Sequence, residues 1–425
     1  MAMKNQKPKI RIGIFNRVWL FLAVLGPGLI TASADNDAPG IATYSRVGSY
    51  YGYSFLWIIL LVTFGEIIVQ EMAARLGAVT GKGAGDLIRE KFGVKTTFYT
   101  MVLLFIANLG TTIAQFAGIA SGAELMGMSK YIFVPVVTAL VIFFVLRGTY
   151  HNVEKFLLVM SLFSLSYIVT VFILKPDFGP ILKSAVVPSF ELNTDYILAV
   201  LATVGTTITP WGFFYMQSSV VDKGVEIESY PLTKLDVVFG AAWGNIVSAF
   251  IMISTGATLF LSGIRVESSE EAALVLAPLA GEWAGLLFTI GLMGASILAA
   301  IVLPLSTVYA ISEAFGWERG LSQRRDDAPF FYWLYVGIVL FSALFVLIPG
   351  LPLFRIMWLS QTANAIFLPI LLILVLKLVN DKDLMGNYRN KKGQNYFAIG
   401  LTVFVTIVTI ALFLIPFITD ASIPI

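Results

Sequence analysis

Two carboxylates stand where a membrane-spanning segment is interrupted. Asp35 and Asp37 precede Pro39 and Gly40 inside a segment, 18 to 48, that is otherwise apolar and long enough to span a bilayer. Carboxylates at this depth persist where they face a cavity, a partner or an ion. Pro39 removes a backbone donor and Gly40 loosens the chain, so the helix should break here and leave carbonyls pointing inward. A broken helix with carboxylates predicts a cation site.

A kinked span offers a plainer explanation of the same residues. Asp35 and Asp37 would then reach the membrane surface or pair with Arg46. We favour the cation site because two acids beside a helix break exceed what a kink requires.

A second polar interruption runs from 201 to 212. It is rich in threonine, including Thr206 and Thr209, and ends in Pro210 and Gly212, so hydroxyls and backbone carbonyls should again be exposed at mid-depth. The threonines could instead bond back to carbonyls of their own helix. Two broken helices at corresponding positions of two halves indicate an inverted repeat with a central site.

Composition sets the class of protein. The chain has 425 residues, of which 58% are hydrophobic and 13% charged, as in a polytopic membrane protein embedded in a lipid bilayer. A net charge of +2 gives no reason to expect nucleic acid, and the absence of cysteine excludes disulfides and thiolate metal sites. The glycine-rich stretch 81 to 85 lacks the spacing of a phosphate-binding loop and is expected to form a flexible cytoplasmic turn. Neither an enzyme nor a resident cofactor is expected.

About eleven spans of roughly 20 apolar residues can be placed along the chain. They lie near 18–48, 53–76, 97–123, 131–147, 155–174, 196–220, 235–262, 284–313, 330–349, 353–378 and 395–417. The predicted organisation is a cytoplasmic N-terminus (1–17), a first repeat (18–174), an extracellular loop (175–195), a second repeat (196–378), and a cytoplasmic loop with a last helix (379–425). Basic residues gather before the first span and after most even-numbered spans, which predicts a cytoplasmic N-terminus, an extracellular C-terminus and a location in the plasma membrane.

Short motifs frame the two interruptions and recur in the later spans. They are Gly26-Pro27-Gly28, Ile41-Ala42-Thr43, Tyr51-Gly52-Tyr53, Ala74-Arg75-Leu76-Gly77, Thr80-Gly81, Ser218-Ser219, Ser306-Thr307-Val308, Ser360-Gln361 and Leu368-Pro369. With these motifs the sequence resembles the Nramp family of divalent-metal transporters. The resemblance implies an all-α membrane protein of LeuT-like fold, with two inverted five-helix repeats, an eleventh helix, and breaks in the first and sixth helices.

The sequence departs from the family pattern at the ion site. Typical members carry Asp-Pro-Gly-Asn in the first break; here Asp37 keeps the metal-binding aspartate and Gly40 replaces the asparagine. The family's methionine in the sixth span is Thr209. A thioether favours softer transition metals, whereas Mg²⁺ prefers oxygen ligands and keeps several waters. These departures resemble those of the Nramp-related magnesium transporters.

The resemblance also implies further contacts for the ion. They would come from the hydroxyl and carbonyl of Thr206, from the carbonyl of Ala34, and from Gln361 or Asn364 through water. The two amides could instead only tie neighbouring helices together. Asp35 is expected behind the ligands or on another face.

The family's proton relay has no counterpart here. Its acidic pair in the third span aligns with Thr112 and Gln115, its sixth-span histidines align with Trp211 and Met216, and the ninth span contains no arginine. None of these residues titrates near neutral pH, so uncoupled transport is expected. Glu66 or Glu71 in the second span could replace the relay, although structural pairing or lining an inner vestibule is the favoured role.

We therefore expect a secondary transporter that imports partly hydrated Mg²⁺, and also Mn²⁺, by alternating access without proton coupling. One alternative is a proton-coupled Mn²⁺ or Fe²⁺ transporter. A sodium-coupled carrier of organic solutes is disfavoured because Asp37 would repel an anionic substrate, and a membrane receptor or scaffold is disfavoured by the paired helix breaks.

Overall fold

The protein is helical throughout the part that the structure describes. The computed structural model describes residues 27–147, 165–321 and 325–419. Within these ranges, nine helices are long and apolar enough to cross a membrane. The predicted N-terminus (1–17) and the beginnings of the first and fifth spans lie outside the described residues. The all-α membrane architecture is confirmed.

The helices follow the predicted order of two halves. The first half contains α2 (Pro27–Asp35), α3 (Ala38–Tyr51), α4 (Leu56–Thr80), α5 (Ala84–Leu125), α6 (Lys130–Arg147) and α8 (Leu165–Leu174). The second half contains α10 (Thr194–Thr207), α11 (Pro210–Asp222), α12 (Tyr230–Thr255), α15 (Ala284–Phe315), α16 (Pro329–Val346) and α17 (Leu353–Val379). The additional helix is α19 (Lys392–Thr419). Short helices in the connections are α9 (Phe178–Val186), α13 (Ser269–Ala273), α14 (Ala277–Ala280) and α18 (Lys382–Met385).

Both predicted breaks are present, each just before a proline. The first separates Asp35, the last residue of α2, from Ala38, the first of α3, and the second separates α10 from α11 at 208–209. Pro39 and Pro210 each lie in the first turn of the helix that follows. A proline is tolerated there because the first N–H groups of a helix have no partner within it. The breaks therefore precede the prolines.

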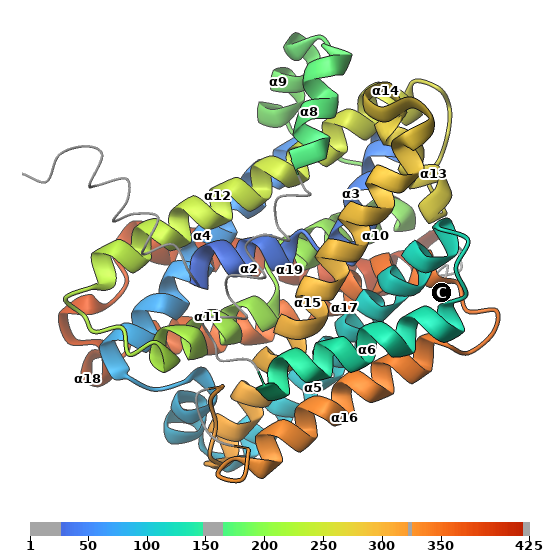
Figure 1. Cartoon of the computed structure of the whole chain (residues 1–425). Coiled ribbons are helices and arrows are strands. Elements are labelled where there is room, and N and C mark those ends of the chain that lie inside the picture. The colour runs from blue at the N-terminus through green and yellow to red at the C-terminus, as the bar shows by residue number, and fades with distance from the viewer. Residues whose placement is uncertain (1–26, 148–164, 322–324, 420–425) are drawn as a thin grey trace, which may run out of the picture.

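The two broken helices lie inside the bundle. The most apolar stretch of the α10–α11 span is completely buried. α12 packs against α2, α3 and α4, while α17 packs against α10 and α5. Figure 1 shows α6 and α16 beside α5 along one flank, away from α2 and α11. The interruptions are thus enclosed by helices of both halves.

Residues 81–83 of the glycine-rich stretch form a turn, as predicted, whereas residues 84 and 85 already belong to a helix. Helix α5 already begins at Ala84 and bends at Gly93, whose φ is 77°. A Cβ on Gly85 would lie 2.4 Å from the carbonyl oxygen of Ala310 in α15. Gly83 and Gly85 are packed closely against α15, because glycine alone leaves room for its atoms, whereas Gly81 has no such neighbour.

Candidate metal-binding site

The two helix breaks meet through a direct hydrogen bond. The Thr209 hydroxyl donates to Oδ1 of Asp35 at 3.0 Å. Each break is also held by a side-chain cap: Asp37 accepts from the Gly40 N–H at 2.7 Å, and Thr209 accepts from the Gly212 N–H at 3.3 Å. Aspartate and threonine are favoured at this position because they satisfy an otherwise unpaired N–H. The same residues therefore begin the helices and present oxygens at the breaks.

Asp37 is buried and oriented by a neutral amide. Gln115 of α5 donates to its second carboxylate oxygen at 2.5 Å. Polar positions recur on one face of α5 at Asn108, Thr111, Thr112 and Gln115, all fully buried. A polar face at this spacing inside an apolar span is the signal that would have identified Gln115 as a contact.

Gly40 borders the space beside Asp37. A Cβ at this position would lie 2.8 Å from the Asp35 carbonyl oxygen, 3.2 Å from Oδ1 of Asp37 and 3.4 Å from the Thr206 hydroxyl. Three oxygens, from Asp35, Asp37 and Thr206, thus converge on one point. A larger residue at position 40 would clash with them unless they moved.

The threonines of the second break differ in their partners. Thr203 and Thr207 bond back to carbonyls of their own helix, at 2.8 Å each. The Thr206 hydroxyl is buried and has no hydrogen-bond partner among the described residues. Thr203 and Thr207 therefore bond to their own helix, which was the alternative explanation for the threonines. The Thr206 hydroxyl does not, and its oxygen can accept a ligand.

The carbonyls predicted as ligands lie in the last turns of broken helices. Ala34 is the second-to-last residue of α2, and Thr206 holds the same place in α10. The last four carbonyls of a helix have no partner N–H within it. Both carbonyls are therefore in positions where an ion can bind them.

Gln361 and Asn364 of α17 are buried and bonded to one another. Asn364 donates to Oε1 of Gln361 at 3.0 Å and exchanges hydrogen bonds with Thr111 of α5. These bonds tie α17 to α5. This agrees with the alternative that the two amides link neighbouring helices. Within the described chain, the hydrogen bonds of neither residue go to Asp37, Thr206 or Thr209.

Asp35 faces another part of the bundle than Asp37. It contacts Thr209 and the carboxyl group of Glu66 in α4, whereas Asp37 contacts α5. Arg46, considered as a partner for either acid, pairs instead with Glu267 at 2.9 Å. The predicted separate orientation of Asp35 agrees with this geometry, but its bond to a candidate ligand was not expected.

The two acids of the second span have different surroundings. Glu71 pairs with Arg75 at 3.1 Å and accepts hydrogen bonds from Tyr230 and Gln394, as expected of structural pairing. Glu66 accepts from Asn245 of α12 at 2.5 Å and lies against Asp35. Only Glu66 is therefore near the helix breaks.

The arrangement around Asp37 can bind a hard cation through oxygen alone. Its donors are one carboxylate, the Thr206 hydroxyl and the carbonyls of helix ends, while the Thr209 hydroxyl bonds to Asp35. In the described residues, no group of three or more histidine, cysteine, aspartate or glutamate side chains could hold a metal. One carboxylate with few neutral oxygens suits an ion that keeps part of its water.

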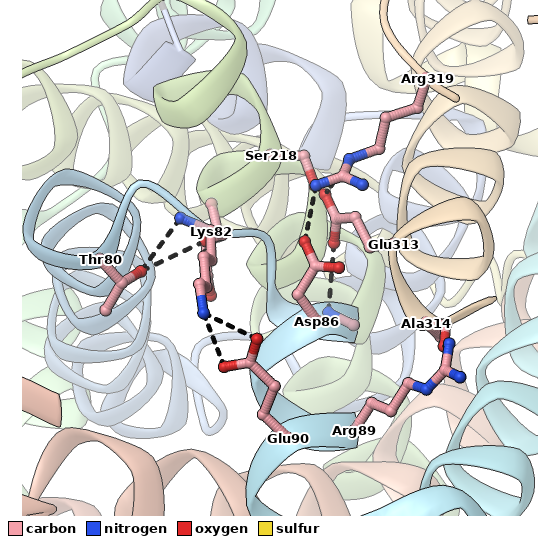
Figure 2. A network of polar contacts seen from close by, with 11 residues as sticks. Thr80, Lys82, Asp86, Arg89, Glu90, Ser218, Glu313, Ala314 and Arg319 are labelled. Atoms are coloured by element: carbon pink, nitrogen blue, oxygen red, sulfur yellow. Dashed lines mark hydrogen bonds and ion pairs between the residues drawn. The ribbon is translucent and has the colours of Figure 1, made fainter. Parts of the chain in front are cut away.

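A second polar network joins the ends of α5, α11 and α15 (Figure 2). Buried Glu313 accepts hydrogen bonds from the Ser218 hydroxyl at 2.7 Å and from the Gly85 N–H at 3.2 Å. Arg319 pairs with Asp86 at 2.6 Å and lies 3.7 Å from Glu313. A polar cavity of about 390 Å³ borders Ser218, Glu313 and Arg319. These contacts close the end of the bundle that the charge pattern assigns to the cytoplasm.

Solved structures share this fold. A manganese transporter from Eremococcus coleocola, solved with an aromatic bis-isothiourea compound, superposes with a TM-score of 0.77 over 99% of this chain and 93% of its own, at 18% identity. Mhp1, a nucleobase-cation-symport-1 family transporter, has a TM-score of 0.60 at 14% identity, covering 92% of this chain and 91% of its own. The predicted LeuT-like fold is confirmed.

Curated relatives match over nearly the whole length. The divalent metal cation transporter MntH of Erwinia tasmaniensis is 27% identical over 88% of this chain and 90% of its own. MntH of Pectobacterium carotovorum is 25% identical over 93% of this chain and 94% of its own. The family model described as natural resistance-associated macrophage protein-like, or Nramp, matches residues 28–415. This protein therefore belongs to the Nramp family.

Proposed function

We propose that the protein is a secondary transporter that imports Mg²⁺, and also Mn²⁺, across the plasma membrane by alternating access without proton coupling. Support for divalent-metal transport comes from the relatives, whose names describe them as divalent metal cation transporters. Binding and translocation need no covalent chemistry, so we do not propose an enzymatic activity.

The observation that carries the choice of ion is the oxygen-only surrounding of Asp37. Gly40 and Thr209 stand where the family pattern has an asparagine and a methionine, and the atoms nearest to Gly40 are oxygens of Asp35, Asp37 and Thr206. Oxygen ligands suit Mg²⁺, and the loss of the asparagine removes a direct ligand that retained water would replace. A thioether would favour softer metals.

The neutral contact on Asp37 supports the absence of proton coupling. Gln115 occupies the position of a family acid and donates a hydrogen bond directly to Asp37. An amide neither takes up nor releases a proton near neutral pH. Ion binding at Asp37 therefore has no neighbouring relay in α5 to which it could couple.

Titration calorimetry with purified protein tests the assignment of the site. Mg²⁺ should release or absorb heat with the intact chain, and Asp37→Ala should weaken binding at the Asp37 site itself by at least about 100-fold, as expected when the charged ligand is lost. Glu71→Gln, on α4 and engaged with Arg75, is the control and should bind as the intact protein does. Unchanged Mg²⁺ binding by Asp37→Ala would refute the site.

Proton-coupled transport of Mn²⁺ or Fe²⁺ remains the alternative. The printed names of the relatives and of the manganese transporter favour Mn²⁺ for those proteins. Glu66, a buried acid against Asp35, could supply a relay outside α5. Proton flux that follows metal uptake in liposomes would establish this alternative.

A further inference from the structure

We propose that Asp35 and Glu66 form a second position for a divalent cation, adjacent to the Asp37 site and joined to it through Thr209. This inference rests on the proposed function, because it concerns the path of the same transported ion. The position lies between α2, α4, α11 and α12.

The two carboxyl groups are buried and in contact. Asp35 has 7% of its surface exposed and Glu66 has 2%, and their side chains interact directly. Neither forms an ion pair with lysine or arginine in the part of the chain that the structure describes. Adjacent buried carboxylates without a positive partner are unfavourable. A bound cation would supply the missing charge.

Unpaired oxygens surround this pair. Oδ1 of Asn245, which lies against Glu66, has no hydrogen-bond partner among the described residues, and the same holds for Oε1 of Gln70. Asn245 and Gln70 are 4% and 3% exposed. Buried polar atoms are nearly always paired, so the unpaired oxygen of Asn245, beside an acid pair that has no positive partner among the described residues, indicates a missing ligand.

The contacts place the Asn245 side chain beside Glu66 and the Gln70 side chain at the second break. Asn245 donates to Oε2 of Glu66 at 2.5 Å, so its own oxygen lies beside that carboxyl group. Gln70 follows Glu66 by one helical turn on α4. If Gly212 carried a Cβ, that atom would lie 2.9 Å from the Gln70 amide nitrogen and 2.7 Å from the Thr209 hydroxyl. The Gln70 amide and the Thr209 hydroxyl are therefore neighbours.

The chemistry of these groups favours a divalent metal ion. Two carboxylates provide two negative charges, and the Asn245 amide adds a neutral oxygen. Hard divalent cations bind such oxygens, with water completing the shell.

Thr209 connects this position to the Asp37 site. Its hydroxyl donates to Asp35, and the same residue is a candidate ligand for the ion beside Asp37. An ion at either position can therefore exchange this shared oxygen as it moves to the other. The two positions become successive stages of one path.

Calorimetry provides the first test. The intact protein should bind two Mg²⁺ per chain, and the double variant Asp35→Asn with Glu66→Gln should bind one. Asp37→Ala should also retain one ion, now at Asp35 and Glu66. Glu71→Gln removes a carboxylate from the same helix and should leave both ions bound. One ion per chain in the intact protein, unchanged in the double variant, would overturn the proposal.

Anomalous diffraction from crystals soaked in Mn²⁺ provides a second readout, which locates each ion directly and does not depend on the heat of binding. Two peaks are expected, one beside Asp37 and one between Asp35 and Glu66, with only the latter lost in the double variant. A single peak beside Asp37 would refute this inference while leaving the proposed function intact, and would assign the acid pair to a shared proton or Na⁺. Absence of both peaks, with no Mg²⁺ binding, would refute both proposals.

Discussion

At the scale of single residues, the proposed preference for Mg²⁺ depends on the asparagine side chain that Gly40 lacks in the first break. A Cβ at Gly40 would lie 2.8 Å from the Asp35 carbonyl oxygen, 3.2 Å from Asp37 and 3.4 Å from the Thr206 hydroxyl, so glycine lets these oxygens approach one another closely. A hard ion prefers such oxygen ligands and completes its shell with water. Selectivity for Mg²⁺ would therefore rest on the loss of the asparagine ligand as well as on the change from thioether to hydroxyl.

Replacing Thr209 tests the ligand chemistry. Thr209→Met should weaken Mg²⁺ binding about tenfold while preserving Mn²⁺ binding, because a thioether favours the softer ion. Thr209→Ser keeps the hydroxyl and the helix cap and is the matched control. Calorimetry with both ions measures the ratio; equal losses for Mg²⁺ and Mn²⁺ in Thr209→Met would contradict a role in selectivity.

The sequence identified Asp37, Thr206 and Thr209 because each stands at a break that proline and glycine reveal locally. It could not reveal that Gln115 holds Asp37 or that Thr209 bonds to Asp35, since these contacts join residues far apart in the chain. Such contacts depend on how helices pack. Local pattern therefore predicts which residues are at the site, whereas tertiary structure decides their partners.

At the scale of elements, close backbone approach fixes the start of α5 against α15. A Cβ on Gly85 would lie 2.4 Å from the carbonyl oxygen of Ala310 and 2.8 Å from the backbone nitrogen of Ala314. The sequence suggested flexibility here because several glycines are adjacent. Periodicity alone does not show that Gly83 and Gly85 pack against α15, where they allow the two helices to approach closely.

Gly85→Ala should therefore destabilise the protein. The added methyl group meets backbone atoms that cannot rotate away, and overpacking of this kind costs about 1–3 kcal/mol. Gly110→Ala is the control on the same helix, since a Cβ there meets nothing within 4 Å. Thermal unfolding in detergent should show a lower midpoint for Gly85→Ala alone; equal midpoints would contradict the packing account.

The network around Glu313 should control access from the predicted cytoplasmic end. Arg319 pairs with Asp86 and neighbours Glu313, so Arg319→Ala should loosen the contacts of α5 and α11 with α15. The chain has no cysteine, so Ser218→Cys provides a unique thiol at this network. Maleimide labelling at position 218 should accelerate severalfold in the Arg319→Ala background.

Arg325→Ala is the matched control for this experiment. Arg325 lies in the same connection, over the ring of Trp333, and makes no ion pair with Glu313 in the described structure. Its removal should leave the labelling rate unchanged. Equal acceleration by both variants would indicate general loosening of the connection rather than loss of this network.

At the scale of the whole molecule, the charge pattern predicts how the bundle sits in the membrane. Glu270 lies in the connection assigned to the outside and Glu318 in one assigned to the cytoplasm, and both are exposed. With an impermeant maleimide on intact cells, Glu270→Cys should be labelled and Glu318→Cys only after lysis. The reverse pattern would invert the predicted topology.

The order of helices was predictable because each span is a long apolar segment with a polar connection. The breaks were predictable in kind, but their exact positions were shifted by the preference of Pro39 and Pro210 for a first helical turn. The short helices in the connections, such as α9, were not predicted, because segments of that length lack a clear apolar repeat.

The membrane potential alone can drive entry of a divalent cation. Moving two charges inward is worth about 4.6 kcal/mol per 100 mV. This equals roughly three decades of concentration. A protein of this architecture therefore needs no proton to accumulate Mg²⁺.

The most direct test measures Mg²⁺ uptake and internal pH together in proteoliposomes with an imposed negative internal potential. We expect Mg²⁺ to enter without acidification, at a rate that is independent of a proton gradient and is abolished by Asp37→Ala. Acidification that rises in proportion to Mg²⁺ uptake and disappears with the same variant would contradict the account.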